Sequence, residues 1–407
     1  MTRIAILGAG PIGLEAALAA AQRGDDFRVY EAAATVGGHL RRWGHVRTFT
    51  TWDMNVSPRM RSALPDAPLG DGLPSGAELA DDLLEPIAAL PELHGRIHLR
   101  TQVLAVGREG LLKHEAIGDP RRASRPFRLL VGRPDGSEVI AHADVVVDAT
   151  GTYGNPNRLG DGGIDAVNER AFEDRIARFL PALAGDAAGW AGRTILLTGA
   201  GHCAQTAVRQ LAEFARDAPG TRVLWAVRDA TPDWSAVAAD PLPERAALNA
   251  AAAELAAGAS GAVELRAGCV TEALHGRDGR IVVTLRNGQP EEVEVDRILA
   301  CNGGVPDHAL YRQLQVHECY ATSGPMNLAA ALLGEPGGDC LAGSSHGPET
   351  LINPEPGFFI LGAKSYGRNS QFLLQIGWQQ VDDVFTSLIG QEPPVPGQAV
   401  ATSGALE

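Results

Sequence analysis

The sequence predicts an α/β protein in which two parallel-sheet units follow one plan and the second unit is inserted into the first. Three observations predict this fold. A glycine-rich turn follows an apolar strand at the start of the chain, a second such turn occurs near residue 199, and residues 144–151 and 296–303 close the two units in similar ways. The chain of 407 residues is long enough for two or three domains. We therefore expect two Rossmann-like dinucleotide-binding domains, one formed by residues 1–160 and 303–407 and one by residues 190–302.

Composition and charge argue against several classes of binding partner. The 49 acidic and 35 basic residues give a net charge of −14, which argues against a nucleic-acid partner. No apolar run approaches the ~20 residues of a membrane span. The five cysteines (Cys203, Cys269, Cys301, Cys319 and Cys340) have no spacing suited to zinc, so we expect reduced thiols, no metal and a cytoplasmic location.

The first glycine-rich turn predicts a nucleotide site. Residues 3–7 (RIAIL) are typical of a buried parallel strand, and the turn Gly8-Ala9-Gly10-Pro11-Ile12-Gly13 leads into an alanine-rich helix up to about residue 23. Gly8 permits the sharp turn, Gly10 lets a pyrophosphate approach the backbone, and Gly13 lets helix and strand pack closely. Free N–H groups at the helix start favour the phosphates, so we expect a dinucleotide here with Pro11 and Ile12 among its contacts.

An acidic residue after the next strand narrows the choice of nucleotide. Glu31 follows the strand expected at 27–30 and can accept hydrogen bonds from a ribose diol, whereas it disfavours a 2′-phosphate. FAD or NAD fits this site. FAD is preferred because the glycine pair Gly37-Gly38, followed by His39, lets the chain wrap the ribityl phosphate. His39 is interpreted as a backbone partner in this loop rather than as an acid or base.

A third segment carries a family resemblance. Residues 143–151 (ADVVVDATG) form an apolar strand that ends in Ala149-Thr150-Gly151. This ending resembles the signature of the flavoproteins with two dinucleotide-binding domains, the superfamily that holds disulfide reductases and class B flavin monooxygenases. The resemblance implies that Thr150 and Gly151 lie near the flavin and that Val103, in segment 101–106, lies at the adenine.

The second glycine-rich turn predicts a nicotinamide-nucleotide site. Gly199 and Gly201 follow a strand at 194–197, and Ala204 stands where the first turn has its third glycine. The next strand, 222–227, ends in Arg228, whose guanidinium can hold a 2′-phosphate. NADPH is therefore preferred over NADH. The alternative is a surface arginine without a ligand.

The carboxyl-terminal part departs from the superfamily pattern. Its members usually end a strand with Gly-Asp, but here Gly362 is followed by Ala363, so backbone N–H groups or Lys364 would replace the acid. The helix expected at 370–388 resembles the element whose start faces the flavin pyrimidine. Lys364 and Arg368 are candidates to bind the flavin phosphate or an acidic substrate, and simple surface solvation is the alternative.

A closer resemblance supports the architecture more than it indicates the reaction. Residues 54–58 (MNVSP), 153–157 (YGNPN), 345–350 (SHGPET) and 364–368 (KSYGR) resemble bacterial FAD-dependent oxidoreductases or flavoprotein monooxygenases. No closely spaced cysteine pair supports a disulfide reductase. The predicted NADPH site and the missing cysteine pair favour an NADPH-dependent monooxygenase that uses molecular oxygen and a flavin C4a-(hydro)peroxide on a small organic substrate. Asn55 could hold the peroxide or merely cap a helix. A reductase or dehydrogenase without oxygen insertion and a non-catalytic redox sensor remain the alternatives.

Overall fold

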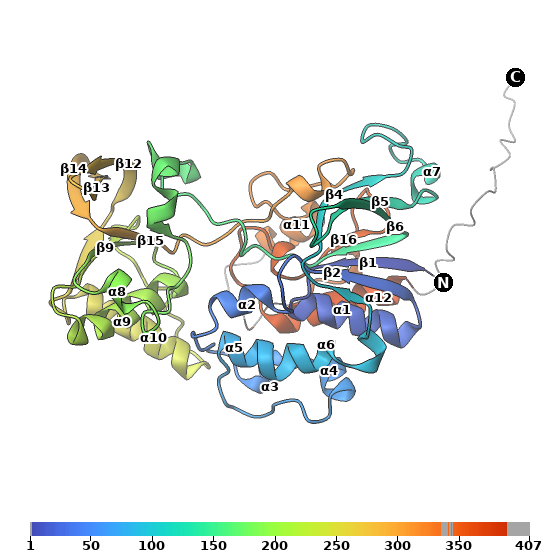
Figure 1. Ribbon diagram of the computed structural model, residues 1–407, viewed down its shortest axis with the longest axis horizontal. Helices are drawn as coiled ribbons and strands as arrows, with labels where there is room; N and C mark the ends of the chain where they lie inside the picture. The colour runs from blue at the N-terminus through green and yellow to red at the C-terminus, as the bar shows by residue number, and fades with distance from the viewer. Residues whose placement is uncertain (1, 335–340, 342, 344, 389–407) are drawn as a thin grey trace, which may run out of the picture.

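The computed structural model describes residues 2–334, 341, 343 and 345–388, and these residues form two sheet-based units (Figure 1). Figure 1 shows the first unit in blue, teal and red and the second in green and yellow. Each unit has a five-stranded parallel sheet, helices on one face and a three-stranded antiparallel sheet on the other. The predicted fold class is confirmed.

The first sheet combines strands from both ends of the chain. Its order is β16-β7-β1-β2-β3 and every neighbouring pair is parallel. The strands are β1 (Arg3–Leu7), β2 (Asp26–Tyr30), β3 (Ile97–His98), β7 (Val145–Asp148) and β16 (Phe358–Ile360). Because β1 lies between two partners and both faces are covered, its last four side chains are all buried.

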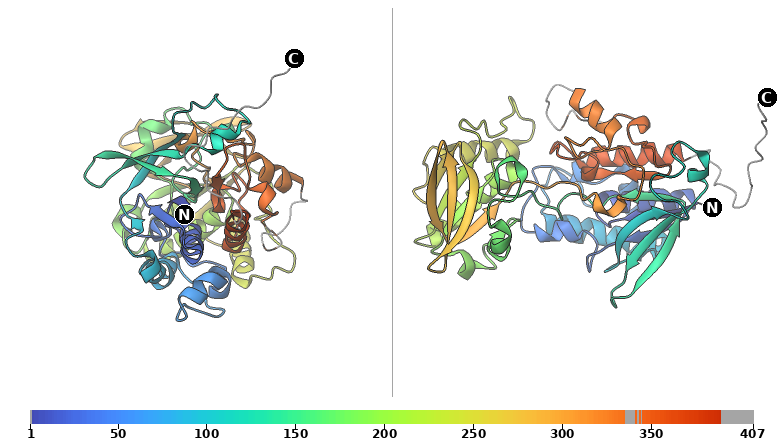
Figure 2. Two further views of the ribbon diagram at one scale, coloured as in Figure 1. Left: turned by 90° about the vertical axis from the view of Figure 1, so that its right-hand side faces the viewer. Right: turned by 90° about the horizontal axis from the view of Figure 1, so that it is seen from above.

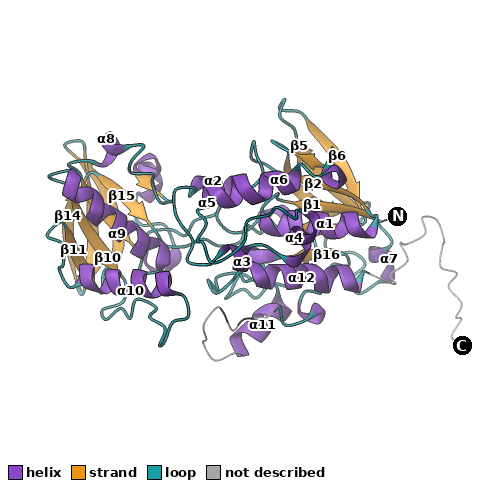
Figure 3. Cartoon of the chain, turned by 90° about the horizontal axis from the view of Figure 1, so that it is seen from below, coloured by secondary structure: helices purple, strands orange, loops and turns teal. Residues whose placement is uncertain are grey.

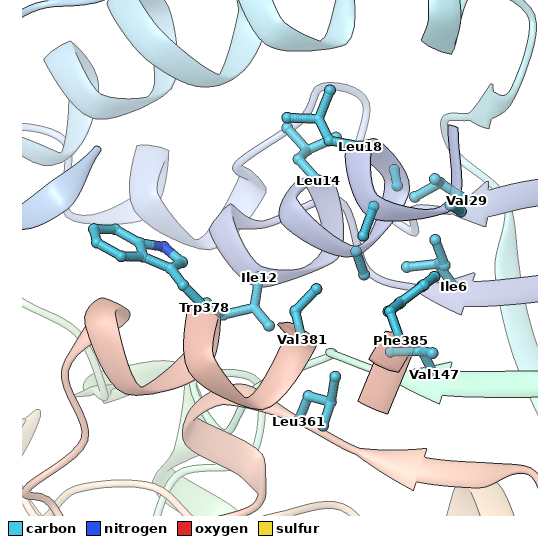
Figure 4. Close-up of a cluster of buried hydrophobic side chains, with 14 of the residues drawn as sticks. Ile6, Ile12, Leu14, Leu18, Val29, Val147, Leu361, Trp378, Val381 and Phe385 are labelled. Atoms are coloured by element: carbon cyan, nitrogen blue, oxygen red, sulfur yellow. The ribbon is translucent and has the colours of Figure 1, made fainter. Parts of the chain in front are cut away.

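Helices α1 (Pro11–Arg23) and α12 (Leu374–Ser387) cover one face of this sheet. Figure 4 shows their apolar side chains meeting those of the sheet, with Ile12 and Val381 between the two helices. Gly24 ends α1 in the left-handed conformation, with a φ of 71°, and its N–H donates to the carbonyls of Ala20 and Ala21 in the last turn of the helix. The opposite face packs on β4 (Gln102–Arg108), β5 (Phe127–Gly132) and β6 (Glu138–Ala143).

The second sheet repeats the plan with order β11-β10-β9-β15-β8. Its strands are β8 (Ile176–Ala177), β9 (Thr194–Thr198), β10 (Arg222–Val227), β11 (Val263–Ala267) and β15 (Arg297–Ala300). Helices α9 (His202–Asp217) and α10 (Pro243–Ala256) cover one face (Figure 3). The other face packs on β12 (Val270–Arg277), β13 (Arg280–Asn287) and β14 (Gln289–Val295). The second sheet includes β8, which precedes the predicted boundary at residue 190; that boundary stays a prediction.

Two chain crossings join the units, and they run side by side (Figure 2). The N–H of Asn157 donates to the carbonyl of Gly303 at 2.9 Å, and the N–H of Val305 donates to the carbonyl of Asn155 at 2.9 Å. Pro156 and Gly304 form an antiparallel bridge between these bonds. The chain therefore leaves and re-enters the first unit at one place, as an inserted second unit requires.

Shorter helices lie between these elements. They are α2 (Gly38–Arg42), α3 (Trp52–Asn55), α4 (Pro58–Ala63), α5 (Gly76–Glu78), a π-helical turn (Leu79–Leu84), α6 (Glu85–Ala88), α7 (Pro120–Ala123), α8 (Ala187–Trp190) and α11 (Met326–Gly334). Among the described residues, no helix combines the length and the apolar character needed to cross a membrane.

Candidate functional site

The turn between β1 and α1 has the geometry that a dinucleotide phosphate needs. Gly8 has a φ of 97°, and a Cβ atom there would lie 2.8 Å from the carbonyl oxygen of Ala149. A Cβ atom on Gly13 would lie 1.9 Å from the carbonyl oxygen of Gly8, so α1 can approach β1 only with glycine here. The Cβ position of Gly10 faces open space, with no heavy atom within 4 Å. A phosphate can therefore reach the free N–H groups and the positive end of the α1 dipole.

Glu31 is held at the end of β2 by two backbone donors. Its carboxylate accepts the N–H of Ala9 at 2.7 Å and the N–H of Ala33 at 2.7 Å. Each oxygen keeps a further acceptor site, so the fixed carboxylate can still bind a ribose diol. Gly38 packs close to this loop, because a Cβ atom on it would lie 2.4 Å from the Cβ of Ala33.

A cavity of about 450 Å³ extends from this turn across the carboxyl ends of the first sheet. The structure brings together in its wall most of the residues predicted for the first nucleotide, namely Gly8, Gly10, Pro11, Ile12, Glu31, Gly38, His39, Val103, Thr150, Gly151, Gly362 and Lys364. Gly13 lies behind the turn and supports it. A long cavity with an open glycine cradle and a fixed carboxylate fits the adenine dinucleotide part of FAD.

His39 lines this cavity. Burial is the main cause that lowers the pKa of its imidazole, and Arg42 lowers it further. Because the pKa falls from an ordinary value of 6.5, the ring is neutral at pH 7. Its ring centroid is 5.5 Å from that of Tyr153, so the ring is part of an aromatic contact between α2 and the segment after β7.

Lys364, which lines the cavity, belongs to a buried ion pair. Lys364 Nζ donates to Asp148 Oδ2 at 2.7 Å and to the Thr150 hydroxyl at 3.0 Å, and the side chains of Lys364 and Asp148 are 1% and 0% exposed. Asp148 Oδ1 accepts the hydroxyl and the N–H of Thr150 at 2.7 and 3.1 Å. The pair ties the end of β7 to the turn after β16. Lys364 thus lines the predicted cofactor site, but Asp148 neutralises its charge.

The other two predicted catalytic residues lie outside this cavity. Asn55 is buried at the end of α3, and its amide donates to the carbonyl of Thr51 at 2.7 Å and to the hydroxyl of Thr50 at 2.9 Å. These bonds hold the loop before α3. Arg368 is exposed, and its guanidinium donates to Asn157 Oδ1 at 3.3 Å, beside the chain crossing.

Helix α12 starts at the cavity, as the resemblance implied, but later than predicted. The helix begins at Leu374 rather than at residue 370, because Leu373 is extended and the side chain of Asn369 accepts the N–H of Gln371 in a turn. Leu374 lines the cavity wall, and no side chain caps the helix start. Its free N–H groups can therefore stabilise negative charge on a bound ring.

The turn between β9 and α9 repeats the first cradle. Gly199 has a φ of 107°, and a Cβ atom there would lie 2.3 Å from the carbonyl oxygen of Cys301. The Cβ position of Gly201 faces open space, while Ala204 is fully buried against the sheet. Arg228 is exposed directly after β10, and its guanidinium has no partner within the described part of the chain. These residues fit the pyrophosphate and ribose of a nicotinamide nucleotide.

A second cavity, of about 590 Å³, lies between the two units. Its wall is mainly apolar and comes from the segment 43–55, the start of α12 and the starts of α9 and α10. Phe372 and Leu374 line both this cavity and the first one. His202 lines this cavity, and its buried Nε2 has no hydrogen-bond partner among the described residues. Burial lowers the pKa of this imidazole. The cavity therefore adjoins the first cavity at the start of α12 and the second nucleotide cradle at the start of α9.

Sequence reasoning missed several residues of this site. Asp148 and Cys301 stand at the ends of the two segments that close the units, and Cys203 is the second residue of α9, directly after the second glycine-rich turn. Because β9 and β15 are neighbours, the sheet brings Cys203 and Cys301 together although the sequence separates them widely. Cys340 lies outside the described residues. In the part of the chain that is described, no three His, Cys, Asp or Glu side chains are grouped to hold a metal.

Comparisons with known proteins place this architecture in a family. The family model described as pyridine nucleotide-disulphide oxidoreductase matches residues 2–320. No curated protein matches the chain. The bacillithiol disulfide reductase of Bacillus cereus is similar in structure, with a TM-score of 0.68, 17% identity and coverage of 96% of this chain and 99% of that one.

Two oxygenating enzymes are similar to nearly the same degree. The ornithine N-hydroxylase of Kutzneria sp. 744 has a TM-score of 0.63 at 15% identity, covering 96% of this chain and 99% of that one. The cadaverine monooxygenase of Erwinia amylovora has a TM-score of 0.63 at 13% identity, covering 99% and 98%. At such identities the likeness shows the fold, whereas the family match extends over most of the chain. Together with the two cradles, the match shows that the chain belongs to the pyridine nucleotide-disulphide oxidoreductase family and is an FAD- and NAD(P)H-dependent oxidoreductase.

Proposed function

We propose that the protein is an NADPH-dependent flavin monooxygenase that acts on a small, mainly apolar organic substrate. The observation that carries the proposal is the cavity of about 590 Å³ between the units, which shares Phe372 and Leu374 with the cofactor cavity. A substrate in this cavity would lie beside the FAD cavity and beside the start of α9. The structural neighbours include both a monooxygenase and a disulfide reductase, so the choice rests on this site.

The residues of the chain have distinct tasks in this proposal. Bound FAD would accept hydride from NADPH and pass electrons to molecular oxygen. The glycine cradle and Glu31 hold its phosphates and ribose, and the buried Asp148–Lys364 pair fixes the turn that carries Thr150 and Gly151. The apolar wall of the second cavity keeps water away from the reacting groups.

Isotope labelling tests oxygen insertion. The purified protein is incubated with FAD, NADPH and ¹⁸O₂ together with a panel of small apolar amines, sulfides and ketones, and products are analysed by mass spectrometry. The proposal predicts that one labelled oxygen atom enters a product for each NADPH consumed.

Two other results would point to the alternatives. NADPH oxidation with reduction of an added acceptor and no labelled product would indicate a reductase or dehydrogenase without oxygen insertion. Absence of NADPH oxidation by FAD-loaded protein under every condition would indicate a non-catalytic flavin-bound sensor. Either result would contradict oxygen insertion by this chain.

An Arg228→Ala variant tests the preference for NADPH. Loss of charge-assisted hydrogen bonds to a 2′-phosphate costs about 1.5–3 kcal/mol, so the KM for NADPH should rise roughly 10- to 150-fold. The KM for NADH should stay unchanged because NADH has no such phosphate. Steady-state NAD(P)H oxidation measures both constants. The matched control is Arg222→Ala, at the opposite end of β10, which should alter neither KM. An equal change for both nucleotides would contradict the assignment.

A further inference from the structure

The first turn of α9 holds one of two thiols that meet at the carboxyl edge of the second sheet. Cys203 is the second residue of α9, and Cys301 directly follows β15. β9 and β15 are parallel neighbours, and the N–H of Cys301 donates to the carbonyl of Thr198 at 3.0 Å, immediately before the glycine-rich turn. The contact between the two thiols changes the pKa of each.

The two thiols differ in access. Cys203 is exposed to the cavity between the units, whereas Cys301 is buried with an exposed fraction of 6%. The hydrogen bond from Cys301 lowers the pKa of the Cys203 thiol, while the same contact and burial raise the pKa of the Cys301 thiol. The helix start adds a positive dipole at Cys203. Cys203 is therefore the accessible nucleophile and Cys301 the partner behind it.

We propose that Cys203 and Cys301 form a peroxide-oxidisable dithiol that closes to a disulfide and weakens nicotinamide-nucleotide binding at the turn between β9 and α9. This inference rests on nucleotide binding at that turn and not on oxygen insertion. Among the described cysteines, this pair alone joins a cavity-facing thiol to a second thiol in contact with it.

The chemistry of closure balances with hydrogen peroxide as the oxidant. The Cys203 thiolate attacks one peroxide oxygen, the O–O bond breaks, and the products are a sulfenic acid and hydroxide. The Cys301 sulfur then attacks the Cys203 sulfur, the S–S bond forms, and the sulfenic hydroxyl leaves as water after taking up a proton. The two thiols lose two electrons and two protons, and the peroxide becomes two waters. A small-molecule thiol reverses the change by exchange.

Closure changes the nucleotide cradle because Cys203 belongs to it. A disulfide bond of roughly 2.05 Å is much shorter than a thiol–thiol hydrogen bond. Its formation draws the first turn of α9 toward the end of β15 and displaces the N–H groups that would bind the pyrophosphate. Gly199 already lies against Cys301, since a Cβ atom there would be 2.3 Å from the Cys301 carbonyl oxygen. The turn therefore has little room to compensate.

The test uses the full-length FAD-loaded protein and needs no substrate. Protein is treated with hydrogen peroxide, digested without reduction and analysed by mass spectrometry, and NADP⁺ binding is measured by calorimetry before and after treatment. We expect a disulfide-linked peptide pair containing Cys203 and Cys301 and a Kd for NADP⁺ that rises about tenfold, within the usual range of coupling between sites. Dithiothreitol should restore the original Kd.

Variants separate the pair from other thiol effects. Cys301→Ala should bind NADP⁺ as the reduced parent does and should keep that affinity after peroxide treatment, because no disulfide can form. Cys301→Ser should behave in the same way if the first variant folds poorly. Cys319→Ser, which changes a thiol outside the pair, should respond to peroxide as the parent protein does. The proposal is overturned if no Cys203–Cys301 disulfide forms, if the disulfide forms without a change in Kd, or if the reduced protein does not bind NADP⁺. Failure of oxygen insertion would leave all these readouts intact.

Discussion

A Gly10→Ala variant is expected to fold normally and to be purified without FAD. The Cβ position of Gly10 is free of protein atoms, so the change does not strain the chain, but the methyl group would occupy the space where a phosphate approaches the start of α1. Loss of two charge-assisted hydrogen bonds would cost about 3–6 kcal/mol. This cost corresponds to a decrease in FAD affinity of roughly a hundredfold to ten-thousandfold.

Flavin absorbance per protein chain and titration of apoprotein with FAD measure this effect. Gly107→Ala in β4 is the matched control, because its Cβ position is equally open and lies outside the cofactor cavity. The control should retain FAD at the parent level. Retention of FAD by Gly10→Ala with unchanged affinity would contradict the placement of the phosphates at this turn.

A Glu355→Gln variant should lose about 3–5 kcal/mol of unfolding free energy, because it leaves buried guanidinium groups without a counter-charge. Glu355 is 1% exposed and accepts Arg108 Nε at 2.6 Å and Arg122 Nε at 2.9 Å, and it also accepts the N–H of Gln315 at 2.7 Å. Burial lowers the pKa of Arg108. The cluster joins the antiparallel sheet of the first unit to the segment before β16.

Urea denaturation followed by circular dichroism measures the loss, with FAD present at a fixed concentration because ligand binding shifts apparent stability. Glu294→Gln is the matched control, since Glu294 pairs with Arg277 and Arg280 on the exposed side of β14 and such surface pairs contribute about 0–1 kcal/mol. An equally small loss of unfolding free energy in both variants would contradict the prediction that the buried Glu355 cluster stabilises the fold.

The sequence was informative where a residue type is forced by local geometry. Gly8, Gly13 and Gly199 occupy positions where a Cβ atom would collide with backbone, so their motifs predicted the turns and the strands around them. Arg228 and Glu31 were predicted as nucleotide-binding residues because each directly follows a strand. These local rules predicted both parallel sheets, because each glycine-rich turn marks a strand–turn–helix–strand order that is typical of a dinucleotide-binding unit.

Features that depend on distant segments were not predictable in the same way. The pairing of Cys203 with Cys301 depends on the neighbourhood of β9 and β15, and the pairing of Lys364 with Asp148 depends on β16 entering the sheet beside β7. Asn55 lines the cavity between the units and its amide also donates to Thr50 and Thr51 in its own loop, so its placement beside the flavin stays a prediction. A single sequence does not show which of several possible partners a buried side chain will bind in the folded protein.

The position of β16 has a consequence for synthesis of the protein. Phe358 pairs with Val146 in the first sheet, so that sheet stays incomplete until the carboxyl-terminal part of the chain has emerged from the ribosome. The second sheet is built from strands within residues 176–300 and can form earlier, because domains generally fold as units during synthesis. The FAD cavity needs Gly362 and Lys364, which follow β16. The nascent chain thus acquires its nicotinamide-nucleotide turn first, and FAD capture marks the completion of the first unit.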